Sequence, residues 1–224
     1  MHIPEQVPGE SGRSYALRAI KENIIRLDLT PGTRVSESAL AAELGLSRTP
    51  VGEALNELSK SKIVEVYPQK GSIIALIDYE LVEEARFIRE VLECAVVELV
   101  CLQAEPEDLH SLSENVKLQK YYLSNSDPDM LLQLDDRFHR TLFTIARKPQ
   151  AYAMMENTAV HFDRVRSMSL STLKDLKIVQ DHEAILTAIT RREVDQARKL
   201  MKCHLNRYKV DKAAIRARYP DYFT

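Results

Sequence analysis

Apolar residues in the first third of the chain recur at helical spacing and are interrupted by turn-forming residues. Their three- and four-residue spacing over 15–29 predicts a first helix, which Thr30-Pro31-Gly32 ends. Ser36 is a candidate N-cap for a short helix over 37–44, because its hydroxyl can accept from a free N–H of the first turn. A third helix opens at Ser47–Pro50 and runs to about residue 60.

Two β-rich runs follow, at 63–67 and 72–75, and the turn-forming segment 68–71 between them predicts a hairpin. Helix, helix, tight turn, helix and then a two-stranded hairpin is the element order of a winged helix-turn-helix domain. In such a domain the last of the three helices enters the major groove of DNA. The alternative is a small α/β domain with no role in DNA binding.

From residue 78 onward the pattern is one amphipathic helix after another. It predicts helices over 79–103, 105–124, 128–146, 149–171, 173–190 and 193–214. We therefore predict a mainly α protein, with an N-terminal winged helix-turn-helix and a C-terminal antiparallel all-α helical bundle. The expected division is a disordered N-terminal arm over 1–10, the DNA-binding domain over 11–77, the helical domain over 78–214 and a C-terminal tail over 215–224.

Composition agrees with this division and narrows the class of protein. The chain has 224 residues, 45% of them hydrophobic, and all six glycines precede residue 72. No apolar run approaches the roughly 20 residues of a membrane helix, and the first residues lack the apolar stretch of a signal peptide. The three cysteines form no Cys-x-x-Cys pair and suggest no disulfide framework. We expect a cytoplasmic protein with no membrane partner.

Charge is distributed unevenly along the chain. The net charge of −2 excludes a uniformly basic coat for nucleic acid, yet residues 11–77 carry nine Lys and Arg against seven Asp and Glu. A recognition helix presents its first turn to base edges, and nearby cations neutralise phosphates. Candidate DNA contacts in that first turn, at the start of the helix-turn-helix and at the wing tip are Arg34, Ser47, Arg48, Thr49, Lys70 and Gly71. The alternative is that these are ordinary surface residues.

One carboxylate and three histidines in the helical region are candidate metal ligands. Asp135 and His139 are four residues apart and share one helix face, while His182 and His204 stand among apolar residues of two later helices. One carboxylate with three imidazoles suits a borderline divalent ion, zinc foremost and nickel or manganese as alternatives. The alternative for each histidine is a hydrogen-bonded core residue.

The stretch from Leu29 to Leu55, LTPGTRVSESALAAELGLSRTPVGEAL, resembles the DNA-binding signature of GntR-family bacterial regulators. That resemblance implies that Arg34, Ser47, Arg48 and Thr49 contact bases or phosphates and that Gly71 brings the wing to the minor groove. One departure matters: the family usually has a DNA-contacting arginine where this chain has Gly52. We therefore expect DNA binding with altered specificity.

The segments around Asp135 and His139, His182 and His204 are similar to the C-terminal FCD domain of the FadR subfamily, and the whole resemblance spans about residues 13–214. It implies a divalent metal held by one Asp and three His inside the bundle, and its Asp-x-x-x-His spacing selects Asp135 over Asp136. A metal buried beside cationic side chains is a natural pocket for a small carboxylate, so we expect a small organic acid as effector. The cationic candidates for holding that acid are Arg89, Arg164 and Arg166. A structural ion pair, for example between Arg89 and Glu93, is the alternative.

Together these patterns predict a regulator and not an enzyme. Binding of an organic acid in the helical domain would change the affinity of a homodimer for a palindromic double-stranded operator, and we expect it to act as a repressor. A metal-responsive sensor is the first alternative. A helical-bundle metalloenzyme is the second, but no further carboxylate is placed as a general base, and the helix-turn-helix would have no role.

Overall fold

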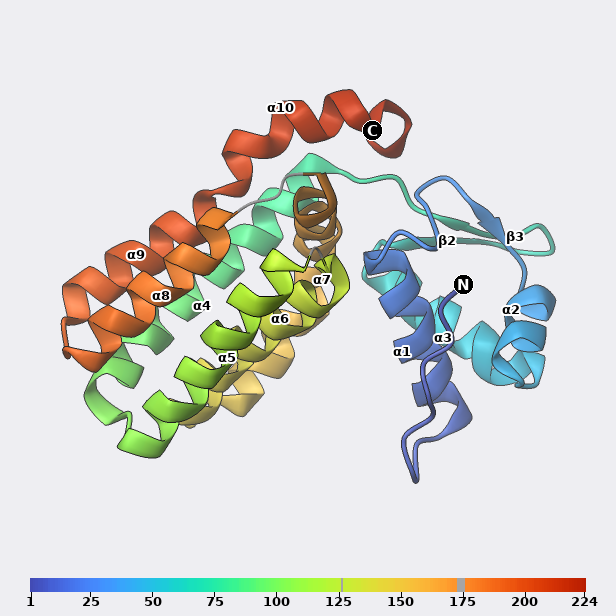
Figure 1. The fold of residues 1–224 in the computed structure, drawn as a ribbon. Coiled ribbons are helices and arrows are strands. Elements are labelled where there is room, and N and C mark those ends of the chain that lie inside the picture. The colour runs from blue at the N-terminus through green and yellow to red at the C-terminus, as the bar shows by residue number, and fades with distance from the viewer. Residues whose placement is uncertain (126, 173–175) are drawn as a thin grey trace. The chain divides into compact units, whose positions relative to one another are not determined.

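The computed structural model describes residues 1–125, 127–172 and 176–224 (Figure 1). The chain divides into two compact units, one formed by Met1–Val82 with Arg216–Thr224 and the other by Glu83–Ile215. The expected fold class is confirmed: a small helix-turn-helix unit with a sheet is followed by an all-helical unit.

The first unit contains three helices that share a core, followed by a small sheet. The elements of this unit are α1 (Gly12–Ile25), β1 (Arg34–Val35), α2 (Glu37–Leu44), α3 (Arg48–Lys60), β2 (Val64–Tyr67) and β3 (Gly71–Ile74). Ile20 and Ile24 of α1 and Leu55 of α3 are fully or almost fully buried, so the two helices share one apolar core. The predicted cap at Ser36 is confirmed, since its hydroxyl accepts from Ala39 N–H at 3.2 Å.

A three-stranded antiparallel sheet completes this unit, in the order β1-β3-β2. The pattern predicted the hairpin of β2 and β3 but not β1, because two residues are too few to show an alternation. β1 pairs Arg34 with Ile73 of the wing. At the hairpin, Gly71 has φ +87° and a Cβ there would lie 3.0 Å from the Val35 carbonyl oxygen, so the backbone approach requires glycine.

We expected residues 1–10 to form a disordered arm; in the structure they lie against α1. The buried Asn23 side chain accepts from His2 N–H at 2.7 Å and donates to the His2 carbonyl at 2.8 Å. Arg18 pairs with Glu10 at 2.8 Å, and the Tyr15 hydroxyl donates to the Pro4 carbonyl at 3.0 Å. These contacts satisfy polar groups of both segments.

The second unit is a helical bundle. Its helices are α4 (Tyr79–Gln103), α5 (Pro106–Ser124), α6 (Pro128–Ile145), α7 (Pro149–Thr172), α8 (Leu176–Thr190), α9 (Val194–Asn206) and α10 (Tyr208–Arg218). Val97 of α4, Phe138 of α6 and Ile185 of α8 meet without solvent exposure in one core. Asp127 caps α6, accepting from Met130 N–H at 3.0 Å. No helix of the described residues has the length and hydrophobicity needed to span a bilayer.

Two predicted helices differ from the observed ones. The single helix expected over 193–214 is wrong, because it is divided into α9 and α10 near Arg207 and α10 continues to Arg218. No glycine or proline marks this break, so the residue pattern gave no sign of it. The start of the helix expected over 173–190 lies at 173–175, outside the described residues.

The chain beyond Ile215 returns to the first unit. Ile77 N–H donates to the Tyr222 carbonyl at 2.8 Å, and Thr224 N–H donates to the Ile77 carbonyl at 3.1 Å. The Phe223 ring stacks on Tyr79 with centroids 4.9 Å apart. The tail over 215–224 is therefore packed, with Phe223 only 7% exposed.

Candidate functional site

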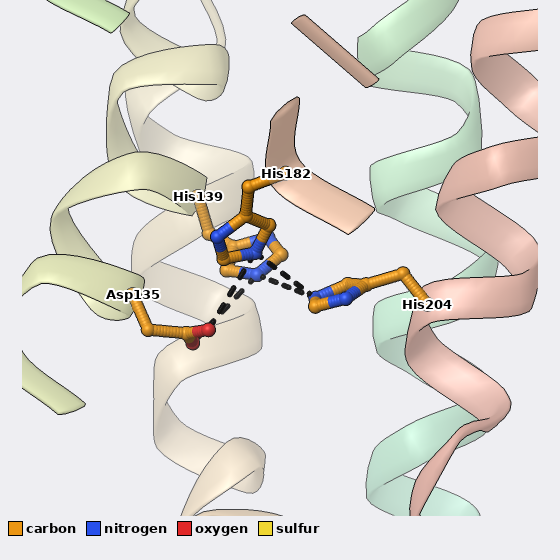
Figure 2. Close-up of side chains that lie close together, drawn as sticks. All are labelled: Asp135, His139, His182 and His204. Carbon is orange, nitrogen blue, oxygen red and sulfur yellow. Dashed lines mark hydrogen bonds and ion pairs between the residues drawn. The ribbon is translucent and has the colours of Figure 1, made fainter. Parts of the chain in front are cut away.

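Three helices of the bundle bring the four candidate metal ligands together (Figure 2). α6 supplies Asp135 and His139 one turn apart, α8 supplies His182, and α9 supplies His204. All four side chains are buried, and one donor atom from each lies within 4.8 Å of the others. The cluster thus unites residues up to 69 positions apart in sequence.

The Nε2 atoms of the histidines and the Asp135 carboxylate face a common centre. His204 Nε2 lies 3.2 Å from Nε2 of both His139 and His182. The nearest Asp135 oxygens lie 3.5 Å from His182 Nε2 and 3.7 Å from His139 Nε2. Ligand atoms 2.0–2.1 Å from a tetrahedral zinc ion are about 3.3 Å apart. The observed distances of 3.2–3.7 Å are close to this spacing, so the donor atoms are gathered as a divalent ion would require.

The ionisation of the cluster also suits a cation. Burial lowers the pKa of His182 well below its ordinary value, and burial lowers that of His204 although Asp181 opposes it. Burial alone would raise the pKa of Asp135, but the Arg166 guanidinium and the three histidines hold it well below its usual range. A carboxylate and neutral imidazoles are the forms that bind a metal.

A cavity of about 40 Å³ adjoins the cluster, which at roughly 10–15 Å³ per water is room for about three waters. The candidate effector residues Arg89 and Arg166 both line it, and Arg164 is not among its described lining residues. The charged and imidazole side chains in its wall are Arg89, Asp135, His139, Arg166, His204 and Arg207. Arg164 is buried elsewhere on α7, 3.4 Å from His161, and burial lowers its pKa to about 10.

Arg89 and Arg166, the two candidate effector residues in the wall, are already paired with carboxylates. Arg166 donates to Asp135 at 2.7 Å and also to Asp136, and it lies 3.3 Å from Asp163. Arg89 donates through Nε to Glu93 at 2.8 Å, which is the ion pair that the sequence left open. Arg89 and Arg166 therefore each form an internal ion pair and also line the cavity.

Three residues contact the outer nitrogens of the histidines, and the sequence identified none of them as a partner of a histidine. Glu93 contacts His139 Nδ1, Gln119 Oε1 lies 2.8 Å from His182 Nδ1, and Asp181 Oδ2 lies 3.4 Å from His204 Nδ1. The i, i+4 spacing of Arg89 and Glu93 on a buried face was a usable signal. Gln119 is 63 residues from His182, and no spacing rule connects them.

The candidate DNA contacts belong to the first unit. Ser47 is the N-cap residue of α3 and Arg48 and Thr49 are its first residues, and all three are exposed. Arg34 on β1 and Lys70 between β2 and β3 are exposed as well. Gly71 begins β3. One neighbour was missed in the sequence: Glu37 of α2 lies 3.6 Å from the Arg48 guanidinium.

A helix-turn-helix with a wing, followed by a helical unit that buries a histidine cluster, places the chain among DNA-binding transcriptional regulators. Residues 14–74 match the bacterial regulatory proteins of the gntR family, and residues 84–207 match the FCD domain. The chain belongs to the GntR family, in the group that carries a C-terminal FCD domain. This family consists of transcriptional regulators and not of enzymes.

Relatives along nearly the whole chain agree with this family. An uncharacterized HTH-type transcriptional regulator in an unstable DNA locus of Streptomyces ambofaciens is 30% identical, over 97% of this chain and 92% of its own length. The HTH-type transcriptional repressor RspR of Escherichia coli is 29% identical, over 97% of this chain and 96% of its own. The solved structure of E. coli McbR/YncC shares the fold, with a TM-score of 0.80 at 20% identity over 94% of this chain and 99% of its own.

Proposed function

We propose that this chain is a cytoplasmic, homodimeric repressor whose helical unit binds a divalent metal, zinc foremost, and a small carboxylate effector that alters operator affinity. The observation that carries the proposal is the convergence of Asp135, His139, His182 and His204 beside a cavity with three arginines in its wall. Differential binding of the effector to two arrangements of the dimer would supply the coupling free energy. Repression is the role named for the E. coli relative RspR.

The metal is tested by its content and by its effect on stability. We expect about one zinc per chain by elemental analysis, with nickel or manganese as the alternatives. Removing the ion with a chelator should lower Tm, since metal present at about 1,000 times its Kd adds about 4 kcal/mol to the free energy of unfolding. A double variant His182→Ala, His204→Ala is the control. Equal metal content in that variant and the wild type would remove this part of the proposal.

The carboxylate effector is supported by the wall of the cavity. Arg166 Nε is buried and has no hydrogen-bond partner among the described residues, so a donor remains for an anion. A divalent cation at the adjacent cluster would raise the local positive potential further. We expect small hydroxy acids to raise the Tm of the metal-loaded chain in a thermal-shift screen, and the matched neutral amides to have no effect. Equal shifts from acids and amides would contradict the proposal.

The small volume of the cavity favours one second candidate, a metal sensor in which the ion itself is the effector. In that case, operator affinity would follow the free metal concentration with no acid present. Fluorescence anisotropy of a labelled duplex, titrated with zinc and then with the acid, separates the two functions. A change on zinc addition alone supports the sensor, and a change that requires the acid supports the ligand-responsive regulator.

The DNA contacts are tested on a duplex that the wild-type chain selects from a random-sequence library. Arg48 is exposed in the first turn of α3, so Arg48→Ala should weaken binding by about 10- to 100-fold and relax base preference. Lys60→Ala, which removes an exposed cation at the other end of α3, is the matched control and should change affinity little. Equal losses in both variants would contradict the assignment of the recognition surface.

The homodimer is supported by an apolar face of α4. Phe87, Val91 and Leu102 are 61%, 52% and 68% exposed and share one side of that helix. We propose that a second copy of the chain covers it, as the two-fold symmetry of a palindromic operator requires. Val91→Glu should convert the dimer into a monomer in light scattering. Met154→Glu, an exposed position on α7, should leave the dimer intact; a dimeric Val91→Glu protein would rule out this face.

A further inference from the structure

Each of the three histidines in the cluster has its second ring nitrogen against an oxygen. The Nδ1 atoms of His139, His182 and His204 face, in that order, Glu93 of α4, Gln119 of α5 and Asp181 of α8. Glu93 and Gln119 are 0% and 1% exposed. Side-chain oxygens from three helices therefore lie outside the three imidazoles, Gln119 in a hydrogen bond and Glu93 and Asp181 in ion-pair contact, while all three Nε2 atoms face inward (Figure 2).

For His182 the hydrogen-bond network determines which nitrogen carries the proton. Asn115 Nδ2 donates to the Leu134 carbonyl at 3.0 Å, so the Asn115 amide oxygen is turned toward Gln119. Gln119 Nε2 donates to that oxygen at 2.6 Å, which leaves Gln119 Oε1 facing the imidazole. An amide oxygen only accepts, so His182 Nδ1 donates to it. The Nε2 atom of His182 is then an open lone pair.

For His139 the group next to Nδ1 is a carboxylate, that of Glu93. Its Oε1 accepts from Arg89 Nε at 2.8 Å, and its Oε2 contacts His139 Nδ1. A buried carboxylate next to an imidazole favours the proton on the nitrogen that faces it. The carboxylate itself is held in place by Arg89, which lines the cavity. Glu93 therefore connects an effector-facing arginine to a candidate metal ligand.

We infer that Glu93, Gln119 and Asp181 are positioning residues for the metal: they hold all three histidines as Nδ1–H tautomers with their Nε2 lone pairs aimed at one point. The inference rests on the proposed metal site. Inward-facing lone pairs as close as 3.2 Å repel one another until a cation lies between them, so the surrounding fold maintains a site that is ready for the ion. Loss of such an outer partner weakens metal binding by about 10- to 100-fold.

The tautomers can be measured on the metal-free full chain. Long-range ¹H–¹⁵N correlation spectra of the ¹⁵N-histidine-labelled protein distinguish Nδ1–H from Nε2–H rings, and single His→Gln variants assign the signals. We expect His139, His182 and His204 to show the Nδ1–H pattern. Gln119→Leu should release His182 to the Nε2–H form, and Gln119→Glu should retain Nδ1–H. An Nε2–H pattern for these histidines in the wild type would overturn the inference.

Metal affinity supplies the second readout, by competition between the chain and a chromophoric chelator for cobalt or zinc. We expect Glu93→Ala to lose about 10- to 100-fold in affinity and to change the cobalt visible spectrum, with partial rescue in Glu93→Gln, whose amide oxygen still accepts. Glu98→Ala is the matched control on the same helix, because Glu98 pairs only with the exposed Arg198 in the described contacts. Circular dichroism of the metal-free proteins checks that each variant folds.

The outcomes separate this inference from the proposed function. A wild-type chain that takes up no cobalt or zinc would overturn the metal site and the inference together. A wild-type chain that binds metal, with Glu93→Ala and Gln119→Leu binding equally well, would overturn the inference and leave the metal site standing. If Glu93→Ala does not fold, Glu93→Gln and Gln119→Leu, which lie on different helices, carry the test.

Discussion

Two glycines of the helix-turn-helix, Gly45 and Gly52, differ in backbone conformation and in the space around them. Gly45 ends α2 with φ +66°, and no atom lies within 4 Å of the place a Cβ would take, so only its backbone conformation favours glycine. Gly52 lies inside α3, where a Cβ would be 3.1 Å from Glu37 Oε1. Glu37 also lies 3.6 Å from the Arg48 guanidinium. At Gly52, where the family resemblance implies an arginine, the chain has instead a site that the Glu37 carboxylate closely approaches.

These environments predict opposite effects of alanine. Gly52→Ala should stabilise the chain by about 1 kcal/mol, because alanine is the better helix former and the half-exposed Glu37 carboxylate can move aside. Gly45→Ala should destabilise it by about 1 kcal/mol, because alanine is strained at positive φ. Tm values from thermal unfolding provide the measurement. A lower Tm for Gly52→Ala would mean that Glu37 is held rigidly in its position.

Restoring the cation at this position should change DNA binding in a defined way. Gly52→Arg adds one positive charge on the face of α3 that carries Arg48, so the slope of log K against log salt should steepen by about 0.9 if the new side chain meets a phosphate. Gly52→Gln, similar in length and uncharged, is the control and should leave the slope unchanged. An unchanged slope in Gly52→Arg would show that Glu37 neutralises the added arginine.

Sequence and structure agree on the four metal candidates but not on their surroundings. Asp135 and His139 were found from one-turn spacing, His182 and His204 from their place among apolar residues of later helices, and the family resemblance joined the four into one set. The contacts of Glu93, Gln119 and Asp181 with the histidines were not predicted, because helix packing brings distant positions together without a sequence signal. Arg164 shows the converse: the sequence offered it as an effector contact, yet it is not among the described residues that line the cavity.

At the scale of elements, the start of a helix could be predicted from the sequence where a capping side chain determines it. Asp127-Pro128 and Ser36 fix helix starts through a hydroxyl or carboxylate that accepts a first-turn N–H. The break between α9 and α10 at Arg207 was missed because Arg207 remains in helical backbone conformation, with φ −60° and ψ −38°. β1 was missed because its existence depends on β3, which lies more than 35 residues later.

The two N-cap serines of the helix-turn-helix predict separable effects. Ser36 accepts from Ala39 N–H, so Ser36→Ala should cost about 1 kcal/mol of stability. Ser47 makes no side-chain capping bond at the start of α3, so Ser47→Ala should leave Tm nearly unchanged and weaken operator binding instead. Thermal unfolding and DNA anisotropy on the same two proteins check both outcomes. A large drop in Tm for Ser47→Ala would show that its hydroxyl has a structural role.

At the scale of the whole molecule, the chain passes between its two units twice, after Val82 and again after Ile215. The second passage is secured in the first unit by the tail, through two backbone hydrogen bonds to Ile77 and the stacking of Phe223 on Tyr79. The metal candidates all lie in the second unit, between Glu83 and Ile215. Stability of the first unit and metal binding in the second should therefore respond differently when the tail is released.

Phe223→Ala tests this separation. Burial of a large apolar side chain contributes about 1.5–3 kcal/mol, so we expect a lower Tm for the first unit. Metal affinity should stay at the wild-type value, because all four candidate ligands belong to the second unit and the tail to the first. With one of two connections loosened, we further expect the metal- or acid-induced change in operator affinity to shrink.

Asp221→Ala, an exposed change in the same tail, is the control. Proteolysis should show that the tail of Phe223→Ala is released. If operator affinity then still changes as much as in the wild type, the chain connection after Val82 alone transmits the response.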